Sequence, residues 1–441
     1  MISGVIINIK DENLKELLKG SSTAFTLKII GLLFGYIFTL LIARMYGADT
    51  LGVFALSITV LTVFSVVGRL GFDTGLVRFV AEYSSQGKPE SLKEVYIKSL
   101  KIVIPVCILL TLLLFLSAPL LAKHLFNKET LSLYFRISSF AILPLVLIVL
   151  HSSSLRGLKK IREYSVLQDV TIPFISILLL ASSLLVSNDE RIPLLVHVLS
   201  LIIVFVFSCL VWLKNANITS YSHSNNIRLS TMLSVSLPML LSQSSFLILE
   251  WTDTIMLGIL RTGFEIGIYS VAMKISMLTS ITLFSINSIA APKFAEFYKK
   301  GDRESLEKII HQSTKFIFWS ASSIILVIFI FPSFILAIFG EEFKTALYAL
   351  LILTFGQFIN ALSGSVGYIL QMTGKQKVFQ YIVLTAAVMN IGLNALLIPR
   401  YGINGAAVAS MLSMAFWNMS SVMFVKKHLN INTLYIPGLT K

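Results

Sequence analysis

Long apolar stretches recur from one end of the chain to the other, and they constrain the fold more than any other feature. A helix that crosses the hydrocarbon core of a bilayer needs roughly 20 mostly apolar residues, and about twelve segments meet this requirement. Because lipid offers no partner to backbone N–H and C=O groups, such segments must be helical. With ends uncertain by several residues, the predicted spans are 22–43, 51–70, 102–121, 131–151, 164–186, 193–213, 231–254, 266–290, 316–338, 346–370, 378–398 and 405–425.

The composition excludes a soluble protein. Apolar residues make up 56% of the chain and charged residues 13%, whereas soluble domains are about 45–50% apolar and about 25% charged. A net charge of +14 would favour a nucleic-acid partner in a soluble protein. In a membrane protein, an excess of Lys and Arg instead marks the cytoplasmic loops, and no nucleic acid is expected to bind.

The distribution of positive charge predicts the orientation. Of the 36 Lys and Arg residues, 25 lie in the termini and in alternate connectors, and seven lie in the connectors between them. The positive-inside rule then places both termini in the cytoplasm, in agreement with an even number of spans. The first 21 residues mix charged residues with leucine, which is typical of an amphipathic segment on a membrane surface. We therefore expect a multi-pass membrane protein with both termini in the cytoplasm.

An internal repeat is visible at an offset of about 215 residues. Residues 50–54 align with 265–269, and Gly87 aligns with Gly301 when one gap is allowed. Six spans per repeat give both halves the same orientation, a plan used by transporters that rock one half against the other. The predicted organisation is an amphipathic segment 1–21, an N-lobe 22–215, a cytoplasmic linker 216–230, a C-lobe 231–425 and a cytoplasmic tail 426–441.

Motifs spread over most of the chain resemble one transporter family. They are Leu41–Phe54, Leu70–Phe79, Asp253–Gly258, Gly267–Ala272, Asn390–Asn394 and Leu397–Ala407. Their order and spacing are similar to those of the polysaccharide transporters, including O-antigen flippases, of the multidrug/oligosaccharidyl-lipid/polysaccharide superfamily. The resemblance implies a MATE-like all-α fold of two parallel six-helix lobes around a central cavity lined by helices 1, 2, 7 and 8. It also implies that the chain moves undecaprenyl-pyrophosphate-linked oligosaccharide across the cytoplasmic membrane by alternating access.

Ionisable residues within the spans are the candidates for substrate binding, because charges in a bilayer are costly and are generally functional. Lys28, Arg69 and Lys274 lie on spans 1, 2 and 8, and span 7 carries Gln243 and Glu250. A diphosphate headgroup requires cations, and Arg and Lys both bind phosphate oxygens. We expect Lys28 and Arg69 to attract the pyrophosphate near the cytoplasmic mouth and Lys274 to lie further along the path; Gln243 is a further candidate for substrate binding in the cavity.

Structural roles for the same cations remain open. Lys28 would then pair with a carboxylate, and Arg69 would extend to the membrane interface, as long basic side chains do near helix ends. Lys274 would neutralise Glu250 or Asp253.

A coupling ion is expected because the sequence contains no nucleotide-binding G-x-x-x-x-G-K-[ST] motif and no cofactor is indicated. Asn390 and Asn394 share one helix face, and with Asp253 they supply the oxygen ligands that a hard cation prefers. Glu250 is a further candidate for this role. Lipid-linked peptidoglycan precursor flippases, to which the chain is related by the resemblance, hold Na⁺ among helices 7, 11 and 12. Hydrogen bonding between helices is the alternative role for the two asparagines; no other metal site is indicated.

Three classes of function compete. A flippase is favoured over a MATE-type drug or cation antiporter because cationic drugs favour an acidic, aromatic cavity, whereas at least two cations lie on the helices expected to line the cavity here. A membrane-embedded polymerase or glycosyltransferase would require a sizeable outer loop, and the predicted outer loops are only about four to eleven residues long. The chain is therefore not expected to be an enzyme. Expected partners are the lipid-linked oligosaccharide, membrane lipids, H⁺ or Na⁺, and other polysaccharide-assembly membrane proteins; the sequence does not identify the glycan.

Overall fold

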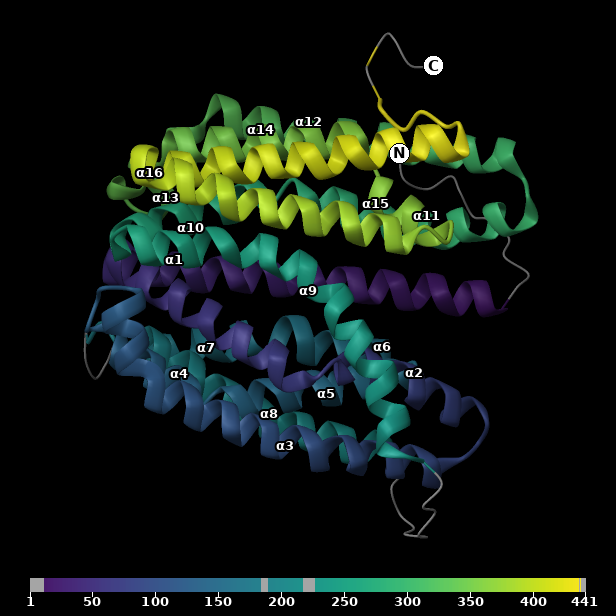
Figure 1. Cartoon of the computed structure of the whole chain (residues 1–441), viewed down its shortest axis with the longest axis horizontal. Coiled ribbons are helices and arrows are strands. Elements are labelled where there is room, and N and C mark those ends of the chain that lie inside the picture. Colours follow the sequence, from purple (N-terminus) through teal and green to yellow (C-terminus); the bar gives the residue numbers. More distant parts are fainter. Residues whose placement is uncertain (1–11, 184–188, 217–226, 436, 438–441) are drawn as a thin grey trace.

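The computed structural model describes residues 12–183, 189–216, 227–435 and 437, with side chains placed from residue 22 onward except at 241–243, 245 and 246. Within these ranges the chain is helical and has no strand (Figure 1). The helices are α1 (Glu12–Arg69), α2 (Phe72–Ser85), α3 (Pro89–Leu120), η1 (Leu121–Leu125), α4 (Leu131–Ser139), α5 (Ile142–Gly157), α6 (Ile161–Ser165), η2 (Val166–Val170), α7 (Thr171–Ser183), α8 (Ile192–Ala216), α9 (Leu229–Leu260), α10 (Gly263–Met277), α11 (Ser280–Lys300), α12 (Arg303–Ile330), α13 (Pro332–Phe339), η3 (Glu341–Ala346), α14 (Leu347–Ser363), α15 (Val366–Met372) and α16 (Gln376–Leu429).

Two of these helices are too long to cross a bilayer once. Helix α1 has 58 residues and α16 has 54, whereas the hydrocarbon core is only about 30 Å thick and a helix rises about 1.5 Å per residue. Each contains one glycine with non-helical geometry, Gly47 (φ 80°) in α1 and Gly402 (φ 57°) in α16. Glycine tolerates positive φ because it has no Cβ. The chain reverses at both residues, so each long helix forms two legs (Figure 1).

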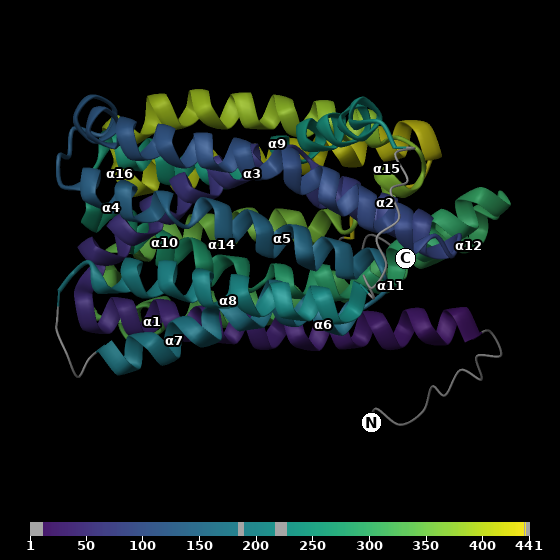
Figure 2. The same ribbon diagram turned by 90° about the horizontal axis from the view of Figure 1, so that it is seen from below.

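The two reversals define the ends of the molecule. Helix α1 begins and α16 ends at the same end, at the right in Figures 1 and 2, which we call the terminal face. Gly47 and Gly402 lie at the other end, the kink face. By length and composition, seven of the described helices are able to cross a membrane, or nine if two bent pairs are counted. Since α1 and α16 each supply two legs, this count is compatible with the twelve predicted spans.

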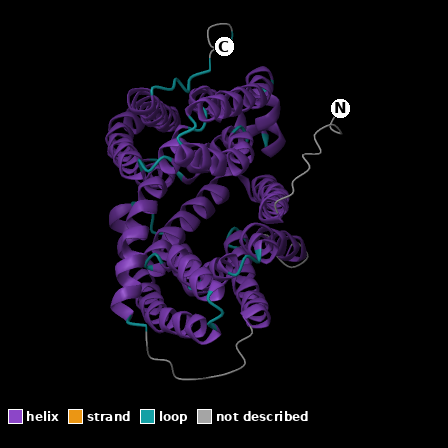
Figure 3. Ribbon diagram, turned by 90° about the vertical axis from the view of Figure 1, so that its right-hand side faces the viewer, coloured by secondary structure: helices purple, strands orange, loops and turns teal. Residues whose placement is uncertain are grey.

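The helices form two groups. Helices α1 to α8 pack against one another, and we call this group the N-bundle; α9 to α16 pack together as the C-bundle. Viewed end on, the two groups lie one above the other (Figure 3). Helix α9 contacts α2 as well as α16, and α1 packs extensively on α10. The domain boundaries predicted from the sequence stay predictions, but α1, α9 and α10 are the helices through which the two groups meet.

Two helical hairpins at the terminal face agree with the internal repeat. The charged connectors between predicted spans 2 and 3 and between predicted spans 8 and 9 are helical, as α2 with the start of α3 and as the end of α11 with the start of α12. Gly87 and Gly301, which the repeat aligns, occupy the two hairpin turns and both have positive φ, 63° and 70°. Equivalent positions in the two halves therefore have the same local backbone conformation.

Candidate functional site

A fully buried carboxylate lies inside the C-bundle. Asp253, on α9, has no exposed surface, and neither do Asn390 and Asn394 on α16. Asn394 donates from Nδ2 to Asp253 Oδ1 at 2.8 Å, and Asn390 Nδ2 lies 3.5 Å from the same oxygen. The other carboxylate oxygen accepts from the hydroxyls of Tyr269, on α10, and Ser410, on the second leg of α16. The structure thus brings together the three residues predicted for an ion site and adds two hydroxyls.

The composition of this cluster limits what it can bind. It contains one negative charge, two amides and two hydroxyls, and among the described residues no ion pair to Asp253 is present. A buried, ionised carboxylate is costly unless a positive charge accompanies it. The described residues contain no group of three His, Cys, Asp or Glu side chains suited to a metal ion. A proton or a monovalent cation with oxygen ligands fits this donor set.

Lys28 lies where the two bundles face each other. Its side chain is exposed, although it belongs to an apolar helix, and its ammonium lies 4.4 Å from the centre of the Phe284 ring, on α11 of the C-bundle. Asp169, in η2 of the N-bundle, is close enough to interact electrostatically, yet no ion pair within 4.0 Å joins the described atoms of the two residues. Lys28 is therefore an accessible cation between the bundles, with acidic and aromatic neighbours.

Arg69 has a more enclosed position. It ends α1, and its guanidinium lies 3.8 Å from the Asp73 carboxylate on α2. The side chain is 16% exposed, and its Nε has no hydrogen-bond partner among the described atoms. The Arg69 side chain is thus mostly buried, it has one carboxylate neighbour, and its Nε–H donor is left without a hydrogen bond among the described atoms.

Lys274 connects α10 to α1. Its ammonium donates to Thr39 Oγ1 at 2.5 Å, and its backbone carbonyl accepts from the hydroxyl of Tyr36. Thr39 is buried and Lys274 itself is exposed. The described contacts include no ion pair between Lys274 and either Glu250 or Asp253, the partners considered from the sequence. The hydrogen bonds to two α1 side chains explain how the cation is held.

The remaining candidates on α9 are separate from the cluster. Glu250 is exposed, and no described hydrogen bond joins it to Asp253 or Lys274. The side chain of Gln243 lies outside the described residues. Sequence reasoning missed Tyr269, Ser410, Tyr36 and Thr39, because each is a common residue in an apolar span and only the packing of three helices reveals its partner.

The bundles touch backbone to backbone near the kink face. A Cβ at Gly52 would lie 1.8 Å from the carbonyl oxygen of Gly263, and a Cβ at Gly267 would lie 1.9 Å from that of Ala48. These contacts are reciprocal, since the repeat offset of about 215 residues relates Ala48 to Gly263 and Gly52 to Gly267. We call this crossing of α1 and α10 the glycine seam. It closes the space between the bundles at the kink face.

Known proteins share both sequence and fold with this chain. The family model described as polysaccharide biosynthesis protein matches residues 17–298, and the MatE model matches 238–396. The probable low-salt glycan biosynthesis flippase Agl15 of Haloferax volcanii is 27% identical over 42% of this chain and 40% of its own length. The capsular polysaccharide biosynthesis protein CapF of Staphylococcus aureus is 26% identical over 48% of this chain and 54% of its own. The matches thus span about half the length of these relatives.

Other similarities extend over nearly the whole chain. An uncharacterized membrane protein of Methanocaldococcus jannaschii is 25% identical over 89% of this chain and 95% of its own. The inward-facing conformation of a multidrug resistance MATE family transporter has a TM-score of 0.75 at 16% identity, covering 93% of this chain and 98% of that one. Lipid II flippase MurJ in an inward closed conformation has a TM-score of 0.76 at 15% identity, covering 93% and 87%. These structures show that the fold is that of MATE-like transporters.

Proposed function

This chain belongs to the polysaccharide biosynthesis protein family, and we propose that it is a flippase that moves a lipid-linked oligosaccharide across the membrane. The expected carrier is undecaprenyl pyrophosphate, whose diphosphate requires positive charge along its route. The observation that carries the proposal is Lys28, an exposed cation on an apolar helix that faces the other bundle. The flippase named among the relatives supports the same class of substrate.

The proposed orientation in the membrane rests on the charge distribution. The terminal face carries the excess of Lys and Arg, so it is the cytoplasmic face, and both termini are cytoplasmic. The glycine seam closes the opposite, extracytoplasmic face. A lipid-linked substrate would therefore enter at the terminal face, from the inner leaflet of a bacterial cytoplasmic membrane.

The cations lie at two depths. Counting 1.5 Å per helical residue from Gly47, Lys28 is about 29 Å and Arg69 about 33 Å from the extracytoplasmic kink. Thr39, which accepts a hydrogen bond from Lys274, is only about 12 Å from it. Lys28 and Arg69 thus form a first binding site for the diphosphate, near the terminal face. Lys274 forms a second site, roughly 16 Å closer to the kink face. A headgroup moves between them when the bundles rock.

A cation gradient supplies the driving force. The Asp253 cluster lies on α9, α10 and α16, and α9 and α10 also form part of the boundary between the bundles. Binding of H⁺ or Na⁺ would neutralise the carboxylate, which would then no longer require hydrogen bonds from all four neighbouring donors. The packing of these helices would change as a result. Glu250 remains a second acid on the same helix. Contact with other polysaccharide-assembly membrane proteins also remains an expectation.

The test uses purified protein in liposomes with a fluorescently labelled lipid-linked oligosaccharide. Transfer between leaflets is followed by the loss of protection from a membrane-impermeant quencher. The variant Lys28→Ala is expected to lower the rate at least tenfold, because a charge-assisted hydrogen bond to the diphosphate is lost. Lys88→Ala, which removes an exposed cation from a loop at the terminal face, is the matched control and should transfer at the parent rate. Parent-rate transfer by Lys28→Ala would sink the assignment.

A MATE-type drug antiporter is the second candidate, favoured by the MatE match to residues 238–396. The same liposomes distinguish the two functions when they are loaded with a cationic dye. The flippase assignment predicts no dye transport, because Lys28 and Lys274 repel a cation in the space between the bundles. Dye transport that is driven by a proton or sodium gradient, in protein that transfers no glycolipid, would favour the antiporter.

A further inference from the structure

Two loops cross between the bundles at the extracytoplasmic face, one in each direction. The loop after η1, in the N-bundle, sends Lys128 onto the end of α9. The segment η3, in the C-bundle, sends Glu342 onto the turn between the two legs of α1. In the six-span repeat both segments connect the third and fourth spans of their own half. The two contacts are thus placed equivalently, although one uses a cation and the other an anion.

The position of Lys128 is fixed by the backbone around it. Asn127 adopts a left-handed conformation with φ 51°, which Asn tolerates better than most residues. The Lys128 N–H donates to Ala122 O at 2.8 Å, which fastens the loop to the preceding helical turn. The side chain then extends out of its own bundle and is half-buried.

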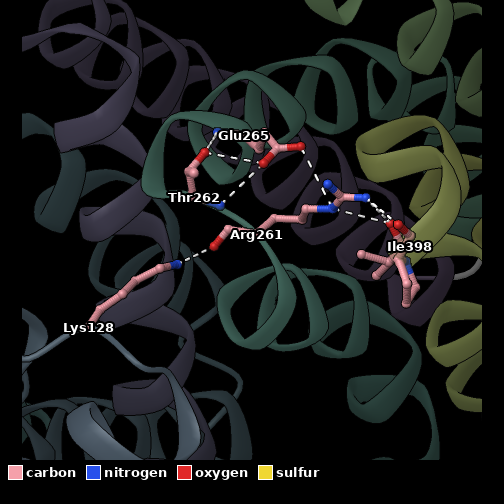
Figure 4. Close-up of polar contacts among 6 residues, drawn as sticks. Lys128, Arg261, Thr262, Glu265 and Ile398 are labelled. Atoms are coloured by element: carbon pink, nitrogen blue, oxygen red, sulfur yellow. Dashed lines mark hydrogen bonds and ion pairs between the residues drawn. The ribbon is translucent and has the colours of Figure 1, made fainter.

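The acceptors of Lys128 are carbonyls at the C-terminal end of α9. Its ammonium donates to Gly258 O at 3.0 Å and to Arg261 O, as Figure 4 shows for Arg261. Carbonyls in the last turn of a helix lack intrahelical partners and carry the negative end of the helix dipole. A lysine ammonium is therefore a favourable group at this position, and it satisfies acceptors that would otherwise depend on water.

The corner that Lys128 holds is hydrogen-bonded to its neighbours. The Arg261 side chain donates to Ile398 O at 2.6 Å and to Pro399 O at 2.8 Å, both on α16. Thr262 and Glu265 form a reciprocal capping box that starts α10 (Figure 4). This corner therefore joins α9, α10 and α16, the three helices that carry the Asp253 cluster. A displacement of this corner would therefore displace all three helices.

The reciprocal contact is made by Glu342. Its Oε1 accepts from the backbone N–H of Ala48 at 2.7 Å, beside the kink at Gly47. Arg44 adds hydrogen bonds to Ile338 O at 2.6 Å and Ala337 O at 2.8 Å, at the end of α13. The first reversal of α1 is thus held by the C-bundle, just as the end of α9 is held by the N-bundle.

A cavity of about 230 Å³ lies beside Lys128, and its lining includes Asp49 and Thr262. The space is lined by both polar and apolar side chains and is large enough for several water molecules. An ammonium that leaves the α9 carbonyls therefore has water and the Asp49 carboxylate within its surroundings. The contact is therefore not sealed in a dry interior, which allows its release during a cycle.

We propose that Lys128 and Glu342 are paired latches that hold the extracytoplasmic face closed, each loop fastening the opposite bundle beside the glycine seam. Lys128 is a positioning residue that acts through the corner joined to the Asp253 helices, so that a change in their packing alters its acceptors. The proposal rests on the proposed function only in taking the two bundles to rock against each other. It makes no assumption about the substrate.

Distance measurement between spin labels tests the latches without any substrate. Labels are attached at Glu190→Cys in the N-bundle and Tyr348→Cys in the C-bundle, two exposed positions, in a full-length Cys107→Ala, Cys209→Ala background. Double electron–electron resonance in nanodiscs then gives the ratio of open to closed extracytoplasmic faces. Lys128→Met is expected to raise this ratio about tenfold or more, because hydrogen bonds to a charged group are lost. Glu342→Gln should raise it less, and the double variant more than either.

Matched controls remove a charge from the same segments without crossing between bundles. Lys123 pairs with Glu129 at 3.5 Å within the N-bundle, and Glu341 pairs with Lys344 at 2.5 Å within the C-bundle. Lys123→Met and Glu341→Gln should leave the distances unchanged, and Lys128→Arg should retain most of the closed population. Unchanged distances in folded Lys128→Met and Glu342→Gln proteins overturn the proposal. If the distances shift as expected but the protein moves no glycolipid, only the flippase assignment is contradicted.

Discussion

Close packing of the two bundles at the kink face depends on the absence of a side chain at Gly52. A Cβ there would lie 1.8 Å from the carbonyl oxygen of Gly263, whereas ordinary contacts begin at 3.4 Å. The added atom is thus about 1.6 Å too close, and the obstacle is backbone, which cannot move aside as a side-chain tip can. The variant Gly52→Ala must therefore push α10 away from α1.

The magnitude follows from the cost of overpacking, about 1–3 kcal/mol for an extra methyl group in a close-packed contact. This cost falls on the closed state, because the seam separates when the bundles part. Ala also favours a helix over Gly by about 1 kcal/mol, but that gain is equal in both states and cancels. The expected result is a rise of about fivefold to 150-fold in the ratio of open to closed kink faces.

The spin-label pair at Glu190 and Tyr348 measures this ratio. The matched control is Gly35→Ala on the same helix, where an added Cβ meets no atom within 4 Å. It shares the helix-propensity gain and lacks the collision, so its distance distribution should equal that of the parent. If Gly52→Ala is folded and its distances also equal those of the parent, the glycine seam does not separate during the cycle and the reasoning is refuted.

Two further predictions concern titration and coupling. Asp253→Asn removes the charge that would attract the proposed coupling ion. Glycolipid transfer in liposomes should then no longer depend on an imposed proton or sodium gradient, while downhill exchange continues. A transfer rate that still depends on the gradient contradicts the proposed ion site. Burial lowers the pKa of Lys128, while Asp49 and Glu265 oppose the shift, so its charged form is lost at a lower pH than that of a free lysine. The closed population should therefore fall as the pH becomes alkaline, and Lys128→Met should abolish this fall.

The sequence predicted the parts of the fold and site that depend on periodicity. Apolar spans and alternating charge gave an all-α membrane protein, and the repeat aligned Gly87 with Gly301, whose backbones agree. Asn390 and Asn394 could be placed on one helix face because they are four residues apart, and family motifs linked them to Asp253. The structure brings these three side chains together.

Contacts across the two bundles could not be predicted in the same way. Lys128 and Gly258 are separated by 130 residues, and nothing in the local sequence of a five-residue loop indicates a partner on another helix. Lys274 was expected to meet either phosphate or an acid, whereas it is held by the hydroxyl of Thr39. Hydroxyls in apolar spans usually bond to their own helix, so the few that bond elsewhere cannot be distinguished without the packing.

The glycine seam has the form of an interface between two identical subunits. In such an interface both subunits use the same surface, so a substitution in that surface occurs on both sides of the contact. Here Ala48 and Gly52 face Gly263 and Gly267, their own counterparts after duplication. A six-span ancestor would have made this contact as a homodimer, and joining its genes freed each side to change. The two sides still constrain each other, because neither can accept a larger residue unless the whole crossing widens.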